Sequence, residues 1–407
     1  MLDDRIINKL IDRLVDRIEQ GNTYVLEKIG ESIKKIGALT PTKARQLQQV
    51  LKFGGNYDEI AKRLAKITEL NVAEIYEIFE EVAKNDYEFS RQFYEYRGIN
   101  YIPYEENIAL QNQVKALANI TANEYVNFSN TLAFGRKVNG KTIYTSLSRT
   151  YQRAIDEAFL SVAQGKETFD SQMSKVIKEL SSSGIRVVDY NTGYSRRLDS
   201  AVRMNLKGAL RDLHNELQNI VGEEFGADGV EISVHQNPAI DHEKVQGRQF
   251  SKEEYKKLND GLSAKDYTGK IFTLDHDHKN GFRPISTMNC YHYIFNIVLG
   301  VNKPEYSEEQ LQEIRDNNNK GFEFDVEHYT NYEGTQLQRS IETAIRKQKD
   351  IQIMAKASDN KDLVLESQKK ITQLTKKYKE LCEVSGLPTK VQRLKVAGYK
   401  RVNVAKM

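Results

Sequence analysis

The chain contains 407 residues, and its 60 Lys and Arg against 57 Asp and Glu give a formal net charge of only +3. That balance argues against a protein coated with positive charge for nucleic-acid binding. Single hydrophobic cores stop growing at roughly 250 to 300 residues, so we expect two or three structural units. Hydrophobic residues make up 39% of the chain, which excludes wholesale disorder.

The sequence shows no signal for a membrane or for export. No apolar run approaches the roughly 20 residues of a membrane-spanning helix, and the charged first twenty residues do not resemble a signal peptide. We therefore expect a soluble protein without a membrane partner. Two cysteines, Cys290 and Cys382, are too few for a disulfide framework, which favours a reducing compartment.

Apolar residues three or four positions apart predict helices throughout residues 1–138, which we interpret as an N-terminal helical docking region. The first helix is expected to end at Gly21-Asn22, because glycine and asparagine are typical of helix ends. The other predicted helices are 25–36, 42–53, 57–70, 72–85, 88–96 and 105–132. Residues 99–103 are the one interruption here that could hold a strand. An Asn139-Gly140 turn marks the end of the region.

The next two segments differ in their periodicity. Residues 139–227 predict a helical connector, with helices at 145–164, 169–182 and 195–221. Val230, Ile232 and Val234 then alternate with polar residues, which predicts a strand. A second strand is expected at 271–274, before a Lys-Asn-Gly turn that leads into 282–285. We interpret residues 228–300 as a small α+β domain.

The C-terminal part is more charged. Residues 301–334 include eight acids and two bases between Glu305 and Glu327, which indicates an acidic linker or exposed arm. Residues 335–386 predict a helical hairpin, with helices at 335–357 and 360–382 and a stop at Gly386. The hairpin has few apolar positions, so we expect it to lie partly open in the isolated protein. The predicted fold class is therefore mainly α, with a small central α+β domain and a C-terminal hairpin followed by a basic tail.

The small domain contains the residues best suited to bind a metal: His235, His242, Cys290 and His292. On one helix the first two would lie roughly 10 Å apart. Pro238 prevents a regular helix between them, so a turn could bring them together. One interpretation is a structural zinc held by all four side chains. The other is a sharply turned loop in which the histidines form hydrogen bonds and Cys290 is a small buried apolar group.

The remaining motifs give no support for catalysis. Asp275-His276-Asp277-His278 precedes a turn and is most simply solvated. Neither Gly54-Gly55 nor Gly261 belongs to a phosphate-binding loop pattern, and the context of Cys290 is not that of a nucleophile. We therefore predict no catalytic residues and no cofactor other than zinc.

The basic tail, residues 387–407, contains six Lys or Arg and no acid. Its cations could lie along DNA phosphates or pair with acids on a partner surface, and both interpretations stay open. The residues concerned are Lys390, Arg393, Lys395, Lys400 and Arg401.

The small domain resembles the phage minor capsid protein family, type two, which is related to the Mu F-like head morphogenesis proteins. The family's run of a strand, two histidines and Gln-Gly is similar to VEISVHQNPAIDHEKVQGRQF, which includes Gln246 and Gly247. Its later Asn-Cys-Arg-His string is similar to NCYHYIFNIVLG, which begins at Asn289. The sequence departs from the family pattern at Val245, where a Trp is usual, and at Tyr291, where an Arg is usual.

The resemblance implies a structural, multicopy protein of a tailed bacteriophage head, located inside the capsid near the portal and assisting assembly or DNA packaging. Its expected partners are the portal protein, the major capsid protein, other copies of itself and, in one interpretation, packaged DNA. It would be present in the host cytoplasm during assembly and in the virion afterwards. No enzymatic activity is implied. Two alternatives remain: a metal-dependent enzyme that uses the His/Cys cluster, and a DNA-binding accessory protein that uses the tail.

Overall fold

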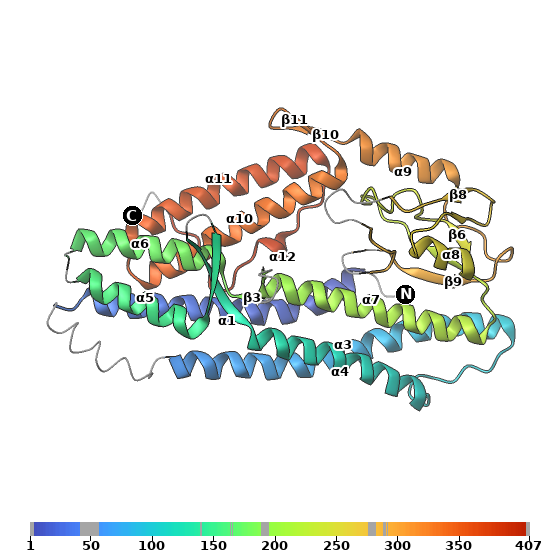
Figure 1. Ribbon diagram of the computed structural model, residues 1–407, viewed down its shortest axis with the longest axis horizontal. Helices are drawn as coiled ribbons and strands as arrows, with labels where there is room; N and C mark the ends of the chain where they lie inside the picture. The colour runs from blue at the N-terminus through green and yellow to red at the C-terminus, as the bar shows by residue number, and fades with distance from the viewer. Residues whose placement is uncertain are drawn as a thin grey trace.

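The computed structural model describes residues 4–40, 57–138, 141–162, 164, 166–188, 195–275, 282–287, 290 and 292–403. Most of these residues are helical, so the prediction of a mainly α fold is confirmed. Figure 1 shows an elongated body of long helices with a small mixed domain at one end. Within the described part of the chain, no helix is both long enough and apolar enough to cross a membrane.

The body is built around its first helix, which packs against five other helices, most of them from distant parts of the chain. The helices of the body are α1 (Asp4–Gly37), α3 (Tyr57–Arg97), α4 (Ile108–Asn130), α5 (Leu147–Val162), α6 (Lys166–Ser183), α7 (Leu198–Glu224), α10 (Asn331–Ala357) and α11 (Lys361–Ser385). One hydrophobic core joins buried residues from α1 through to α11. The docking region, the connector and the hairpin therefore share a core.

Two helices are longer than the sequence predicts. Gly21 lies inside α1 and does not end it. A Cβ at this position would lie only 3.0 Å from Ile67 of α3, so a glycine lets the two helices approach closely. Gly30 is similar, since its Cβ would lie 2.7 Å from the Cβ of Ala357. These glycines permit close helix packing rather than a helix end.

The three short helices expected at 57–96 are likewise one helix, α3. Asn71, which lies between two of the predicted helices, is fully buried and donates to the Tyr125 hydroxyl at 2.8 Å. The predicted helix at 42–53 lies outside the described residues.

A four-stranded antiparallel sheet lies between the helices of the body, with strand order β2-β1-β3-β4. Its strands are β1 (Leu132–Val138), β2 (Lys141–Ser146), β3 (Arg186–Val188) and β4 (Ser195–Arg197). Strands β1 and β2 form a hairpin on either side of the predicted Asn-Gly turn, which itself lies outside the described residues. The strand expected at 99–103 is absent from that described segment.

The small domain contains a three-stranded antiparallel sheet of order β6-β5-β9. Its elements are β5 (Gly229–Ile232), β6 (Gln249–Ser251), α8 (Lys252–Asn259), β7 (Ala264–Lys265), β8 (Ile271–Phe272) and β9 (Ile294–Ile297). The strand predicted from Val230 and Ile232 is confirmed, and β8 confirms the start of the second. Residues 282–285 form no strand, and β9 was not predicted, because its neighbours are mostly apolar and do not alternate.

The acidic segment is not a structureless linker. It folds as α9 (Glu308–Lys320) followed by a hairpin of β10 (Phe322–Phe324) and β11 (Glu327–Tyr329). Ser307 and Gln310 form a capping box that satisfies the first backbone donors of the helix. The buried Leu311 and an ion pair of 2.6 Å between Arg248 and Glu308 hold α9 against the small domain.

The C-terminal hairpin is confirmed, with α10 and α11 packed together and Gly386 ending α11 in the left-handed conformation. We expected the hairpin to lie partly open because it has few apolar positions. The structure differs, because α10 also packs against α1 and α6 and places Met354 in the body core. Polar residues of α10 are buried as well, in pairs such as Asp350 with Arg197 at 3.0 Å. After α11 the chain forms the short helix α12 (Val391–Leu394) beside α10.

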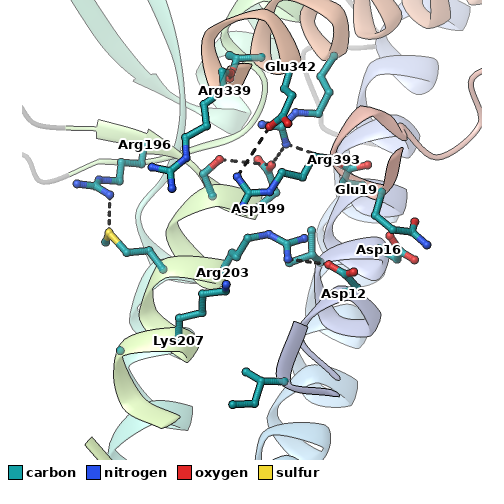
Figure 2. A pocket seen from close by; sticks show the side chains of 18 of the residues that line it. Asp12, Asp16, Glu19, Arg196, Asp199, Arg203, Lys207, Arg339, Glu342 and Arg393 are labelled. Atoms are coloured by element: carbon teal, nitrogen blue, oxygen red, sulfur yellow. Dashed lines mark hydrogen bonds and ion pairs between the residues drawn. The ribbon is translucent and has the colours of Figure 1, made fainter. Parts of the chain in front are cut away.

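Charged side chains gather where α1, α7 and α10 meet (Figure 2). Arg203 of α7 binds Asp12 of α1 at 2.6 Å, and Arg346 of α10 binds Asp199 of α7. These pairs join parts of the chain that are far apart in sequence.

Candidate metal centre

Strand pairing brings the His/Cys cluster together. In the antiparallel pair β5 and β9, Ile232 lies opposite Ile294. The residues that follow β5 and those that precede β9 therefore lie at the same end of the sheet. His242 lies in the turn after β5, while Cys290 and His292 lie just before β9.

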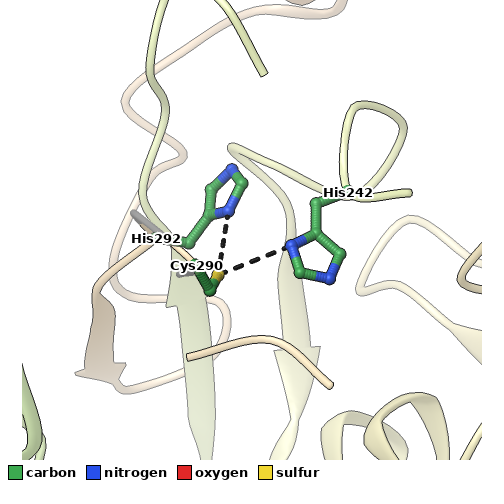
Figure 3. Close-up of side chains that lie close together, drawn as sticks. All are labelled: His242, Cys290 and His292. Atoms are coloured by element: carbon green, nitrogen blue, oxygen red, sulfur yellow. Dashed lines mark hydrogen bonds between the residues drawn. The ribbon is translucent and has the colours of Figure 1, made fainter. Parts of the chain in front are cut away.

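Three of the four expected side chains converge on one point (Figure 3). The Sγ atom of Cys290 lies 3.4 Å from Nδ1 of His242 and 3.4 Å from Nδ1 of His292. The possible ligand atoms of the three lie within 4.8 Å of one another, and all three residues are buried.

His235 lies beside this group and is not one of the three. Its ring centroid is 4.4 Å from that of His292, and the residue is half-buried. Asn289 lies outside the described residues.

Neighbouring acceptors hold the two buried histidines in one orientation. The carbonyl of Arg283 can only accept, so Nε2 of His242 donates to it at 2.8 Å. The backbone N–H of His235 donates to Oε1 of Gln246 at 3.1 Å, which fixes that amide oxygen as an acceptor. Nε2 of His292 contacts the same oxygen at 3.3 Å and therefore donates as well. When neutral, both rings consequently present an unprotonated Nδ1 to Cys290.

This arrangement fits a metal ion better than it fits hydrogen bonds alone. With both rings neutral, Cys290 has one thiol proton for two contacts, so at least one Nδ1 lone pair faces sulfur without a hydrogen between them. A tetrahedral zinc with Zn–N near 2.1 Å and Zn–S near 2.3 Å places nitrogen and sulfur roughly 3.5 Å apart. Both observed distances are 3.4 Å. One sulfur and two imidazoles, each with an outer hydrogen-bond partner, are a donor set that zinc prefers.

Burial and mutual contact set the charge of the cluster. Burial lowers the pKa of His292 well below its usual value, and it lowers the pKa of His235 to about 4, with a further contribution from His242. Burial alone would raise the pKa of the Cys290 thiol, but the hydrogen bond and charge of His242 outweigh it and lower that pKa. The same contact raises the pKa of His242 against the effect of burial. A thiolate beside a neutral His292 favours a bound cation.

Gly247 closes the loop that carries His242. Its φ of +71° lies in the left-handed region, and a Cβ there would lie 2.6 Å from Leu311 and 2.8 Å from Val234. Its N–H donates to the Ile232 carbonyl at 2.7 Å, which returns the chain to β5. The Gln-Gly pair thus combines an outer hydrogen-bond acceptor with the turn that positions it.

Several residues that support the cluster were not predicted from the sequence. Arg283 forms two hydrogen bonds of 2.8 Å to the buried Asp241, the residue before His242. Arg211 of α7 donates to the Cys290 carbonyl at 3.0 Å and so fastens the cluster to the helical body. Asp241 could have been noticed next to a predicted ligand, but nothing in the sequence relates Arg211 to Cys290.

Of the predicted run 275–278, the structure describes only Asp275. Asp275 forms an ion pair with Lys244 at 2.7 Å, and residues 276–278 lie outside the described residues.

The tail lies along the helices of the body. Lys349 donates to the Leu394 carbonyl and Thr23 to the Ala397 carbonyl, at 2.5 and 2.8 Å. Five tail cations were predicted to meet DNA or an acidic partner: Lys395, Lys400 and Arg401 are exposed, and Lys390 and Arg393 are half-buried.

Comparison with known proteins identifies the family. Residues 2–383 match the model of the family described as Phage minor capsid protein 2, so the match includes the body, the His/Cys cluster and nearly all of the hairpin. Neither the curated proteins nor the solved structures contain a significant match. The chain belongs to the phage minor capsid protein 2 family and is a structural protein of the phage head.

Proposed function

We propose that this protein is an internal component of the head, present in several copies near the portal, where it assists head assembly or DNA packaging. The observation that carries the proposal is the family match over residues 2–383. The shared core of the long helices supports a structural role, because a rigid body can hold binding surfaces at fixed positions. On this proposal the protein has no catalytic activity.

Chemical cross-linking in intact virions, followed by peptide mapping, tests the location. We expect cross-links from this chain to the portal protein and protection of the chain from added protease until the heads are opened. Cross-links to outer-surface proteins together with digestion in intact particles would refute an internal position. Cryo-electron microscopy of the portal vertex then gives the copy number.

The proposal includes a structural zinc ion held by His242, Cys290 and His292, with His235 as the nearest candidate for the fourth ligand. Such an ion would stabilise a domain whose strands contain only two to four residues. Elemental analysis of the purified full chain should find about one zinc per chain. Cys290→Ser should lose it. Cys382→Ser is the matched control, since Cys382 is also buried but contacts Gln338 instead.

One observation favours the alternative of a metal-dependent enzyme: Cys290 also lines a cavity of about 270 Å³, which could admit a substrate. A catalytic zinc keeps an open position, whereas a structural zinc is closed by four protein ligands. Cobalt substitution distinguishes the two, since a closed tetrahedral site gives an intense visible spectrum that added cyanide does not change. A spectrum that shifts on adding cyanide would favour the enzyme.

The exposed cations of the tail support a minor role in contacting DNA phosphates or an acidic partner. If three exposed charges act on duplex DNA, the logarithm of affinity should fall with the logarithm of salt concentration with a slope of roughly −3. Replacing Lys395, Lys400 and Arg401 by Gln should remove most of that slope. An unchanged slope would exclude the tail as a DNA contact.

A further inference from the structure

The cavity of about 270 Å³ lies between α1, α7, α10 and the segment around α12. Figure 2 shows the acids Asp12, Asp16 and Glu19 along α1 on one side of the cavity. Arg196 and Arg339 lie on the opposite side, and Lys207 of α7 points into the space between.

Positive charge exceeds negative charge in this cavity. Seven arginines and lysines line it, against five acids. Burial and the nearby Asp199 raise the pKa of Glu19 to about 8, so at neutral pH Glu19 is mostly protonated. The excess is then about three positive charges.

Of the four other acids, Asp12, Asp199 and Glu342 form ion pairs with arginines. Asp12 binds Arg203 at 2.6 Å, and Asp199 binds both Arg346 and Arg197. Pairing does not change the net charge of the lining, so the lining of the cavity as a whole stays positive.

The buried Nε atoms of Arg211 and Arg346, which line the cavity, have no acceptor among the described residues. The Arg211 side chain is only 7% exposed, and leaving a buried N–H of a charged group without an acceptor is unfavourable. An oxyanion in the cavity would supply the missing acceptors.

We propose that this cavity binds a small multivalent phosphate compound, of the size of pyrophosphate or of the phosphate chain of a nucleotide. Guanidinium groups suit this class of ligand, because their planar donors match the oxygens of a phosphate and stay charged when buried. The cavity is too small for a DNA duplex. It would accept a free phosphate compound or a phosphorylated chain end.

The position of the cavity gives binding a structural consequence. Its wall includes α1, α7, α10, Arg393 of the tail and the loop with Cys290. A bound anion would therefore connect the body, the tail and the small domain. This inference does not depend on zinc or on the position in the head.

Isothermal titration of the full chain with pyrophosphate at constant ionic strength tests the proposal. We expect saturable binding and a rise in Tm. Arg339→Gln and Lys207→Gln should each weaken binding about tenfold or more, since each removes a charged donor. Arg203, Arg211 and Arg346 are left unchanged because their ion pairs and hydrogen bonds join separate elements of the fold.

Arg63→Gln, on the exposed face of α3, is the matched control and should bind as the unmodified protein does. Pyrophosphate could also act on a bound metal, but that effect would be the same in Arg63→Gln and in the cavity variants. The difference in affinity between them therefore measures binding in the cavity. Absence of saturable binding at millimolar concentration, or equal weakening by Arg63→Gln and Arg339→Gln, would overturn the proposal.

Two competitors define the ligand class. Citrate of similar charge should bind at least tenfold more weakly, and equal binding would overturn the assignment to phosphate. A short 5′-phosphorylated oligonucleotide that displaces pyrophosphate would support the same chemistry with a nucleic-acid end as its source. An oligonucleotide that does not compete would support a free phosphate compound.

Discussion

The helical body and the small domain are stabilised in different ways. In α1, residues such as Ile11, Leu14 and Ile29 are completely buried, and one core extends through most of the helices. Among the described residues of the small domain, the apolar core contains ten buried residues, one of them Cys290, which contacts the buried His242 and His292. Hydrophobic burial therefore accounts for the body. The small domain combines a smaller apolar core with buried histidines and with contacts to neighbouring helices.

Metal removal should give the largest effect and should separate the two regions. Structural zinc contributes roughly 10 kcal/mol or more to the folding of small domains. Treatment with a strong chelator should therefore expose the amides of residues 229–303 to hydrogen exchange while α1 and α10 stay protected. Full protection of the small domain in metal-free protein would show that its hydrogen bonds suffice. Loss of protection throughout the chain would show that the two regions fold as one.

A buried glutamate should give the body a pH dependence of its own. Glu19 faces Asp199, Arg346, Arg197 and Asp350, and burial, the largest cause, raises its pKa to about 8. Its ordinary value is 4.5, so the folded state holds a proton that the unfolded chain loses. The contribution of protonated Glu19 to the free energy of unfolding is therefore fully present below about pH 4.5 and is lost as the pH rises to about 8. The loss is on the order of 3 to 5 kcal/mol.

Urea unfolding of Glu19→Gln at pH 5, 7 and 9 measures this contribution. The variant should keep more of its stability than the unmodified protein as the pH rises, because a neutral amide does not ionise. Glu31→Gln, at an exposed position of the same helix, controls for the loss of a glutamate. Parallel curves for Glu19→Gln and the unmodified protein would show that Glu19 is not protonated in the folded state.

The sequence predicted helices well where apolar periodicity was long, as in α10 and α11. It predicted the strand at Val230 and Ile232 for the same kind of reason. It could not show that Gly21 lies inside a helix, because a glycine needed for close packing looks like a glycine that ends a helix. It also could not identify the charged cavity. That cavity is formed by residues such as Asp12 and Arg203, which are separated by most of the N-terminal half of the chain.

The packing of α1 against α10 can be tested with a pair of glycine substitutions. Gly30→Ala places a Cβ 2.7 Å from Ala357 Cβ and 2.8 Å from the Met354 carbonyl, so it should destabilise the body by about 1 to 3 kcal/mol. Gly208→Ala, in α7, has no heavy atom closer than 3.9 Å and should stabilise by up to about 1 kcal/mol. If urea unfolding shows that Gly30→Ala lowers the free energy of unfolding while Gly208→Ala raises it, the close contact between α1 and α10 is supported. A stabilising Gly30→Ala would mean that the helices do not approach so closely.

The smallest expected effect concerns the acidic segment and decides to which region α9 belongs. Ser307 accepts from the Gln310 N–H at 3.3 Å, so Ser307→Ala should cost about 1 kcal/mol and increase exchange in residues 308–320. Because Leu311 packs beside Gly247, this opening should also reduce the protection of β5 and β6. Ser307→Thr should restore both, since threonine also caps helices. Faster exchange confined to α9 would show that the helix is an independent arm. Coupled exchange would make α9 a third support of the small domain, beside the His/Cys cluster and Arg211.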